Sequence, residues 1–198
     1  MTRIDKLKEL IKDKEYISSA EIVSSGLDRM IIKDAIDAEI LYKVRNGLYS
    51  TNNVIDDMFY IIQNGNNVIY SNETALYLHG VSDRTPRKYS LSVVQGSSSN
   101  LLIKYNNIKK YYVSKKNFEL GEVYIMSPYG NLIRSYDLER TIVDIIKNES
   151  RIDRQIYTQA IRYYMSSNKR NIQKVLEYAK ELKCLKKVQN ILSLFSED

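Results

Sequence analysis

The chain has 198 residues and a net charge of +6, from 30 Lys and Arg against 24 Asp and Glu. A single cysteine and a single histidine exclude an intrachain disulfide and the metal sites built from several such residues, so we expect no metal ion and no other cofactor. No apolar run approaches the ~18 residues that a membrane span needs, and the charged N-terminus does not resemble a signal peptide. These features predict a cytoplasmic protein without membrane contact.

The N-terminal segment carries the pattern of three short helices. Residues 3–14 place their apolar side chains on one helical face. A second helix follows Ser18, because Ser18 and Glu21 have the spacing of a capping box. The third helix is expected over residues 29–39, with Asp28 as its cap.

A β-hairpin is predicted directly after these helices, over residues 41–51. Asn46-Gly47 between two β-prone runs indicates a tight type I′ turn, which needs a positive φ at both central residues. The pairs expected to face each other are Arg45 and Leu48, Val44 and Tyr49, and Lys43 and Ser50. In this register Lys43, Arg45 and Ser50 point outward, and the opposite side packs on the helices.

Three helices and a basic hairpin predict a winged helix-turn-helix, a fold typical of proteins that bind double-stranded DNA. The third helix would enter the major groove, the hairpin would contact the backbone, and the start of the second helix would bind a phosphate through amide groups. The residues expected to contact DNA are Ser18, Ser19, Arg29, Lys33, Lys43, Arg45 and Asn46. The alternative is a winged helix that only docks proteins, since residues 1–52 contain nine basic and nine acidic side chains.

The remainder, residues 53–198, predicts a second domain of mixed helices and strands. Strands are expected at 68–70, 89–94, 101–105, 109–113, 123–127 and 131–136, and helices at 54–64, 71–80, from 137 onward, 153–166, 169–182 and 184–195. The fold class is therefore α+β: a winged helix over 1–52, then a mixed domain that ends in helices. Residues 151–195 contain ten Lys and Arg against three Asp and Glu, which favours either a surface for a polyanion or a solvated helical face.

No catalytic motif is present. The chain lacks the glycine-rich phosphate-binding loops and the G-x-S-x-G nucleophile turn, and residues 96–99 form a polar loop without a following D-x-D pair. His79 is expected to pack or cap at a helix end. Asp137, expected to cap the next helix, and Asp144, expected to pair with Arg140 or Lys147, both have structural explanations. We therefore expect no catalytic residues and no enzymatic activity.

Three segments in order resemble the AbiE-type antitoxin family of abortive-infection phage defence. They are residues 42–49 in the hairpin, residues 70–86 (YSNETALYLHGVSDRTP) and residues 135–146 (SYDLERTIVDII). The resemblance implies a type IV antitoxin that represses its own promoter by binding inverted repeats. It also implies that the second domain neutralises a nucleotidyltransferase-like toxin without forming a stable complex with it.

The resemblance does not identify the residues that act against the toxin. Charge alone selects the candidates Arg84, Arg87, Lys88, Arg151, Arg154, Arg162, Lys183, Lys186 and Lys187. Two other functions stay open at this point. One is a winged-helix regulator whose second domain binds a small ligand, and the other is an enzyme with a carboxylate site between Asp137 and Asp144.

Overall fold

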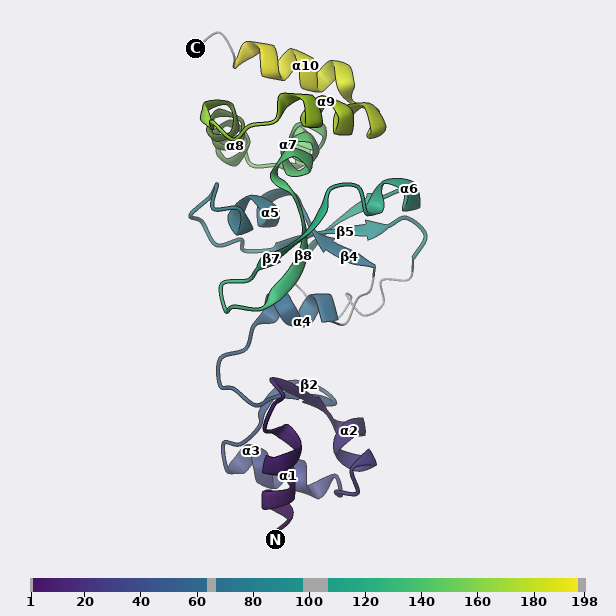
Figure 1. Ribbon diagram of the computed structural model, residues 1–198, viewed down its shortest axis with the longest axis vertical. Coiled ribbons are helices and arrows are strands. Elements are labelled where there is room, and N and C mark those ends of the chain that lie inside the picture. The colour runs from purple at the N-terminus through teal and green to yellow at the C-terminus, as the bar shows by residue number, and fades with distance from the viewer. Residues whose placement is uncertain (1, 64–66, 98–106, 196–198) are drawn as a thin grey trace. The chain divides into compact units, whose positions relative to one another are not determined.

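A computed structural model of the chain describes residues 2–63, 67–97 and 107–195, and the expected strand at 101–105 lies outside these ranges (Figure 1). The chain is a mixed α+β protein, with N-terminal helices beside a small antiparallel sheet, a central mixed sheet and C-terminal helices. It divides into two compact units, residues 1–55 and 56–198. The sequence placed this division after residue 52.

The first unit consists of α1 (Arg3–Ile11), β1 (Tyr16–Ser18), α2 (Ser19–Ser24), α3 (Met30–Asp37), β2 (Tyr42–Arg45) and β3 (Leu48–Ser50). Its antiparallel sheet has the order β1-β3-β2. The three helices close around apolar side chains that are almost wholly excluded from water, among them Leu7, Ile22 and Ile31. Strand β1 was not predicted, because three residues are too few to show the alternation that marks a strand.

The β2–β3 hairpin departs from the predicted register. Arg45 lies opposite Leu48 as expected, but a bulge between Lys43 and Arg45 places Lys43 opposite Tyr49 and Tyr42 opposite Ser50. Gly47 has a φ of +82°, whereas Asn46 is not in the left-handed region, so the turn is not type I′. The bulge takes up one residue, and Ser50 is consequently buried instead of facing outward.

The second unit consists of α4 (Asp57–Gln63), β4 (Val68–Tyr70), α5 (Asn72–Leu78), β5 (Tyr89–Val94), β6 (Ile108–Val113), α6 (Lys115–Phe118), β7 (Glu122–Met126), β8 (Leu132–Tyr136), α7 (Leu138–Lys147), the 3-10 turn η2 (Glu149–Arg151), α8 (Arg154–Ser166), α9 (Ile172–Glu181) and α10 (Leu185–Leu194). Its five strands have the order β6-β5-β4-β8-β7. The pairs β5–β6 and β4–β8 are parallel, and the pairs β4–β5 and β7–β8 are antiparallel.

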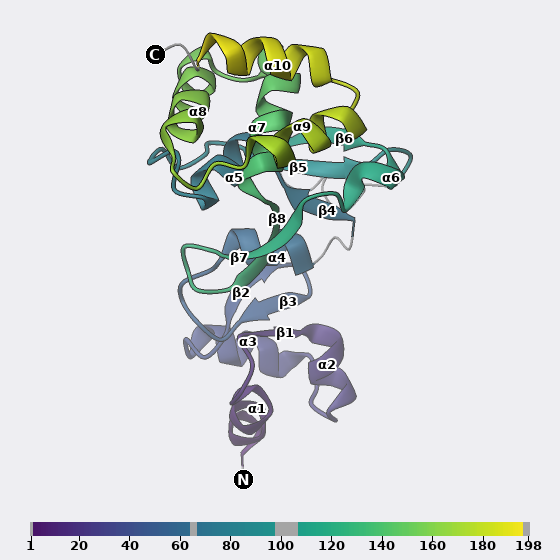
Figure 2. The same cartoon turned by 45° about the horizontal axis from the view of Figure 1, so that its top comes forward.

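Helices cover both faces of this sheet (Figures 1 and 2). Side chains of α4 pack with Leu91 and Val93 of β5 on one face. Helices α5 and α7 cover the other face, and α8, α9 and α10 pack against α7 in the largest apolar core. Helix α7 is therefore enclosed, and every residue from 140 to 146 is buried. Within the described ranges, no helix is long and apolar enough to cross a membrane.

Candidate nucleic-acid interface

Helix α3 turns charged side chains outward, among them the cation Lys33 and the anions Asp34 and Asp37, because its inner face is held in the core of the first unit. Ile31, Ile32 and Ala35 are buried. Arg29 is the residue before the helix, and Lys33 lies within it, four residues after Arg29. This spacing places the two exposed cations on the same side. Met30 is also turned toward solvent and is 75% exposed, which sequence patterning did not indicate.

Three of the expected DNA-contacting cations are available to a ligand. Arg29, Lys33 and Lys43 are exposed, and none of them forms an ion pair with another residue of the described ranges. Two cations elsewhere in this unit are engaged: Arg3 Nη1 lies 2.6 Å from Asp28 Oδ2, and Lys14 Nζ lies 3.1 Å from Glu21 Oε1.

Two other candidates of the hairpin lie at its tip. Asn46 is exposed in the turn. The backbone of Arg45 pairs with Leu48 at the end of β2. Besides Lys43, the hairpin therefore presents the exposed polar side chain of Asn46, and it places the backbone of Arg45 next to this turn.

The start of α2 is not available to a phosphate in the way the sequence suggested. The Ser18 amide donates to Glu21 Oε2 at 2.9 Å, and the Ser19 amide donates to the Gly47 carbonyl at 2.9 Å. The bonds from Ser18, helped by Lys14, lower the pKa of the Glu21 carboxyl to about 2, so this carboxylate is charged at neutral pH. The expectation that Ser18 and Ser19 bind a phosphate through their amides is therefore corrected. Both amides already donate hydrogen bonds within the unit, and the Glu21 carboxylate beside them would repel a phosphate.

The structure separates the basic candidates of the second unit into four groups. Arg84, Arg87 and Lys88 are exposed around one hollow that Lys109 also lines. Arg154 and Arg162 lie along the outer side of α8. Lys186 and Lys187 are exposed on α10, where Lys187 pairs with Glu149 at 3.0 Å. Arg151 and Lys183 line a common pocket beside α7.

The carboxylates that sequence analysis considered for catalysis hold the fold together instead. Asp137 caps α7 by accepting from the Arg140 amide at 2.7 Å, and it also accepts from the Tyr178 hydroxyl at 2.9 Å. Asp144 pairs with Arg140 Nε at 3.1 Å, which selects one of the two partners the sequence left open. His79 Nε2 lies 2.8 Å from the Tyr136 carbonyl oxygen, in keeping with a packing role.

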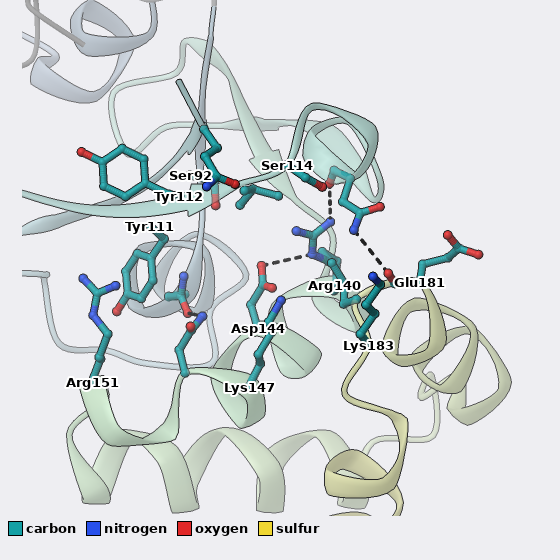
Figure 3. A pocket seen from close by; sticks show the side chains of 16 residues that line it. Ser92, Tyr111, Tyr112, Ser114, Arg140, Asp144, Lys147, Arg151, Glu181 and Lys183 are labelled. Atoms are coloured by element: carbon teal, nitrogen blue, oxygen red, sulfur yellow. Dashed lines mark hydrogen bonds and ion pairs between the residues drawn. The ribbon is translucent and has the colours of Figure 1, made fainter. Parts of the chain in front are cut away.

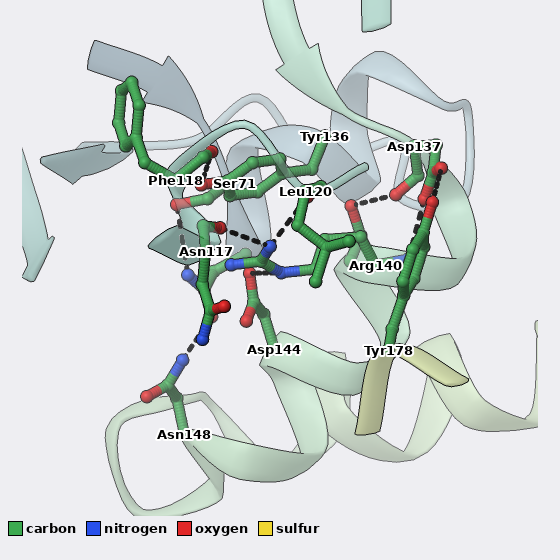
Figure 4. A network of polar contacts seen from close by, with 12 residues as sticks. Ser71, Asn117, Phe118, Leu120, Tyr136, Asp137, Arg140, Asp144, Asn148 and Tyr178 are labelled. Atoms are coloured by element: carbon green, nitrogen blue, oxygen red, sulfur yellow. Dashed lines mark hydrogen bonds and ion pairs between the residues drawn. The ribbon is translucent and has the colours of Figure 1, made fainter. Parts of the chain in front are cut away.

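Arg140 is the centre of a buried polar network that sequence analysis did not anticipate (Figure 4). Its side chain is fully buried, and its Nη1 donates to the carbonyls of Asn117 at 3.0 Å and Leu120 at 2.7 Å. The guanidinium carbon lies 4.1 Å from the centre of the Tyr136 ring. Burial raises the pKa of Asp144, and the charge of Arg140 opposes that shift. An arginine on a helix ordinarily reaches solvent, so no sequence signal marked this one as internal.

Gly121 makes room for this network. Its φ of +78° is unfavourable for other residues, and a Cβ there would lie 2.7 Å from Arg140 Cβ. The Gly121 carbonyl also accepts from the Asp137 amide at 2.8 Å, which joins the loop to the start of α7. Across the residues that the structure describes, no group of three or more His, Cys, Asp or Glu side chains is arranged to hold a metal ion.

Comparison with known proteins identifies the fold only. No family model and no curated protein matches the sequence. Among solved structures, the chain is similar to the crystal structure of the Rv2827c protein from Mycobacterium tuberculosis, with a TM-score of 0.60. The alignment covers 98% of this chain and 81% of that chain at 11% sequence identity. The two proteins thus share a fold of helices and sheets that extends over nearly the whole of this chain.

Proposed function

We propose that the first unit is a winged helix-turn-helix that binds double-stranded DNA through α3 and the β2–β3 hairpin. The element order α1-β1-α2-α3-β2-β3 with a three-stranded antiparallel sheet is that of this fold. The observation that carries the proposal is the outer face of α3, where Arg29 and Lys33 stand unpaired among the described residues beside the exposed Met30. Cations on such a helix bind phosphates and base edges, and an apolar neighbour fits the methyl group of thymine.

The proposal is tested by measuring the affinity of the full chain for a duplex from upstream of its own gene at several salt concentrations. Replacing Arg29 and Lys33 with alanine should weaken binding and flatten the logarithmic salt dependence by about 0.9 for each lost phosphate contact. A matched variant, Lys6→Ala with Lys12→Ala, removes one exposed charge from α1 and one from its C-cap, and should leave the slope unchanged. Equal affinity and equal slopes for the two double variants would refute the assignment of α3.

We further propose that the protein is an autorepressor and a type IV antitoxin. In this role the first unit binds inverted repeats in the promoter, and the second unit counteracts a nucleotidyltransferase-like toxin without a stable complex. The support is the ordered resemblance of residues 42–49, 70–86 and 135–146 to the AbiE-type antitoxins, and a fold that is compatible with two separable tasks. The protein would act in the cytoplasm without catalysis, since Asp137 and Asp144 are committed to structural contacts.

Co-expression with a nucleotidyltransferase-like toxin encoded beside the gene of this protein tests this second role. The full chain should restore growth, and the Arg29→Ala/Lys33→Ala variant should restore it equally while no longer repressing a promoter fusion. Restored growth without repression would separate the two tasks and support the proposal. Failure of the unmodified chain to restore growth would refute the antitoxin role and leave the DNA-binding proposal to its own test.

A further inference from the structure

A pocket lies beside α7 in the second unit, on the face of the sheet that α5 and α7 cover (Figure 3). Its volume is about 360 Å³, within the range of pockets that hold small molecules. Ser92 of β5 and Tyr111 of β6 line one side, Arg140 and Lys147 of α7 line another, and Lys183 approaches from the turn after α9. The pocket is thus assembled from segments that are far apart in the chain.

The inner wall of the pocket contains a buried donor without an acceptor. Nε and Nη1 of Arg140 are satisfied by Asp144 and by two backbone carbonyls. Nη2 is buried as well, and it makes no hydrogen bond to any described residue. A buried polar group without a partner costs about 1–3 kcal/mol, and more when it is charged, so such a group is expected to have a partner that the described residues do not supply. Stacking on Tyr136 holds the guanidinium in this position.

The charge around the pocket favours an anion. Both of its acidic side chains are already neutralised: Asp144 by Arg140, and Glu181 by Lys116 at 2.9 Å. The lysines at the rim of the pocket, in contrast, are not neutralised by a carboxylate of the described residues. Lys147 and Lys183 are exposed and form no ion pair with other described residues. Arg151 is fixed at the edge by the Tyr111 ring, 4.2 Å from its guanidinium carbon, and by a bond to the Lys110 carbonyl.

We propose that this pocket binds a phosphate group of a small molecule, with one phosphate oxygen on Arg140 Nη2 and another near Lys147. A phosphate offers several oxygens in different directions, which suits a buried guanidinium and an exposed ammonium better than a single carboxylate does. The Ser92 hydroxyl supplies a further polar group on the same wall. The innermost donor lies on the inner wall of the pocket and not at its rim, so a terminal phosphate that enters the pocket can approach it, whereas the continuous backbone of a duplex cannot. This site is independent of the proposed DNA-binding surface.

Titration of the full chain with inorganic phosphate, in the absence of DNA, tests the site. Binding should be saturable with one phosphate per chain, and Lys147→Ala should weaken it by about tenfold or more, as expected for the loss of a charge-assisted hydrogen bond. The control is Lys186→Ala, which removes an exposed lysine outside the pocket and should leave the affinity within twofold of the parent. Nucleoside monophosphates and pyrophosphate then show whether the natural ligand extends beyond the phosphate.

Substitution of Arg140 itself risks unfolding, so its role is read by NMR in the unmodified chain. Phosphate should shift the side-chain Nε resonance of Arg140 and leave that of the exposed Arg162 in place. The proposal is overturned if phosphate does not bind at millimolar concentration, or if Lys147→Ala and Lys186→Ala behave alike. It is also overturned if a DNA duplex displaces phosphate and Lys147→Ala abolishes duplex binding, because the surface would then belong to nucleic acid.

Discussion

Replacement of Arg140 by methionine should destabilise the second unit strongly. The variant keeps most of the side-chain volume but removes the cation that faces Asp144 at 3.1 Å. Asp144 is then a buried carboxylate without a counter-charge, and the carbonyls of Asn117 and Leu120 lose their shared donor. Stacking on Tyr136 is lost as well.

The expected magnitude follows from what the substitution leaves behind. Breaking a buried ion pair by removing one partner costs about 3–5 kcal/mol, because the remaining charge stays in a poorly solvated site. For a domain of this size, 1 kcal/mol corresponds to a change of about 3–4 °C in Tm, so the unfolding of the second unit should move down by about 10–20 °C. Burial already raises the pKa of Asp144, and the loss of Arg140 raises it further. The variant should therefore regain stability as the pH falls and Asp144 binds a proton.

Thermal unfolding followed by circular dichroism measures this effect. Arg140→Met with Asp144→Leu removes both charges and should recover part of the lost stability, whereas Arg162→Met, at an exposed site on α8, should change Tm by little. A decrease of less than about 3 °C for Arg140→Met would refute the reasoning, since less than ~1 kcal/mol is the value of an exposed pair. A double variant as unstable as the single one would show that the carbonyl contacts, and not the charge of Asp144, dominate.

Three further predictions concern other parts of the structure. Gly121→Ala should lower stability by about 1–3 kcal/mol in denaturant unfolding, because its Cβ meets Arg140, and should cost more than Gly130→Ala, which has a φ of +88° but no atom within 4 Å. Asp56→Ala should lower stability by about 2 kcal/mol in the same assay, because Asp56 is buried and accepts from the Met58 and Phe59 amides at 3.0 Å, whereas Asp57→Ala should have a smaller effect. Glu21 should titrate by NMR near pH 2 in the folded chain, so its stabilising contribution, present above pH 4.5, should be lost as the pH falls toward 2, and Ser18→Ala should raise the midpoint.

The sequence predicted best where a local signal coincided with a buried face. Asp137 was expected to cap α7, and it does, because a short acidic side chain before an amphipathic run satisfies the first free amides of the helix. The capping box of Ser18 and Glu21 was confirmed for the same reason. These interactions span only a few residues, so spacing along the chain is enough to identify them.

The hairpin shows that local sequence signals predict the position of a turn but not the register of its strands. Asn46-Gly47 correctly marked the position of the turn, but the bulge between Lys43 and Arg45 changed which residues face each other. A bulge depends on how the strand packs against its neighbours, and the pattern of apolar and polar residues in one strand does not contain that information. The predicted outward position of Ser50 was wrong as a result.

The pocket beside α7 could not be predicted from the sequence, for a related reason. Of the basic candidates selected by charge, only Arg151 and Lys183 line it, and Arg140 and Lys147 were not among them. Arg140 and Asp144 are spaced like a surface ion pair on a helix, so nothing in the sequence distinguished them from solvated residues. Their burial arises because the segment that carries Asn117 and Leu120, together with Tyr136 of β8, closes over this side of α7, which is a property of the tertiary structure.

Net charge alone was a poor guide to function, because pairing within the fold decides which charges remain available. Among the basic residues of the C-terminal helices, Lys174 lies 3.0 Å from Asp137, and Lys187 lies 3.0 Å from Glu149. Residues 1–55 carry no net charge, yet Arg29 and Lys33 stand unpaired among the described residues on one side of α3. A polyanion responds to unpaired charges at a short distance, since more distant charges are screened by salt. The neutral first unit is therefore the stronger candidate for DNA, and the cations left unpaired beside α7 fit a small anion.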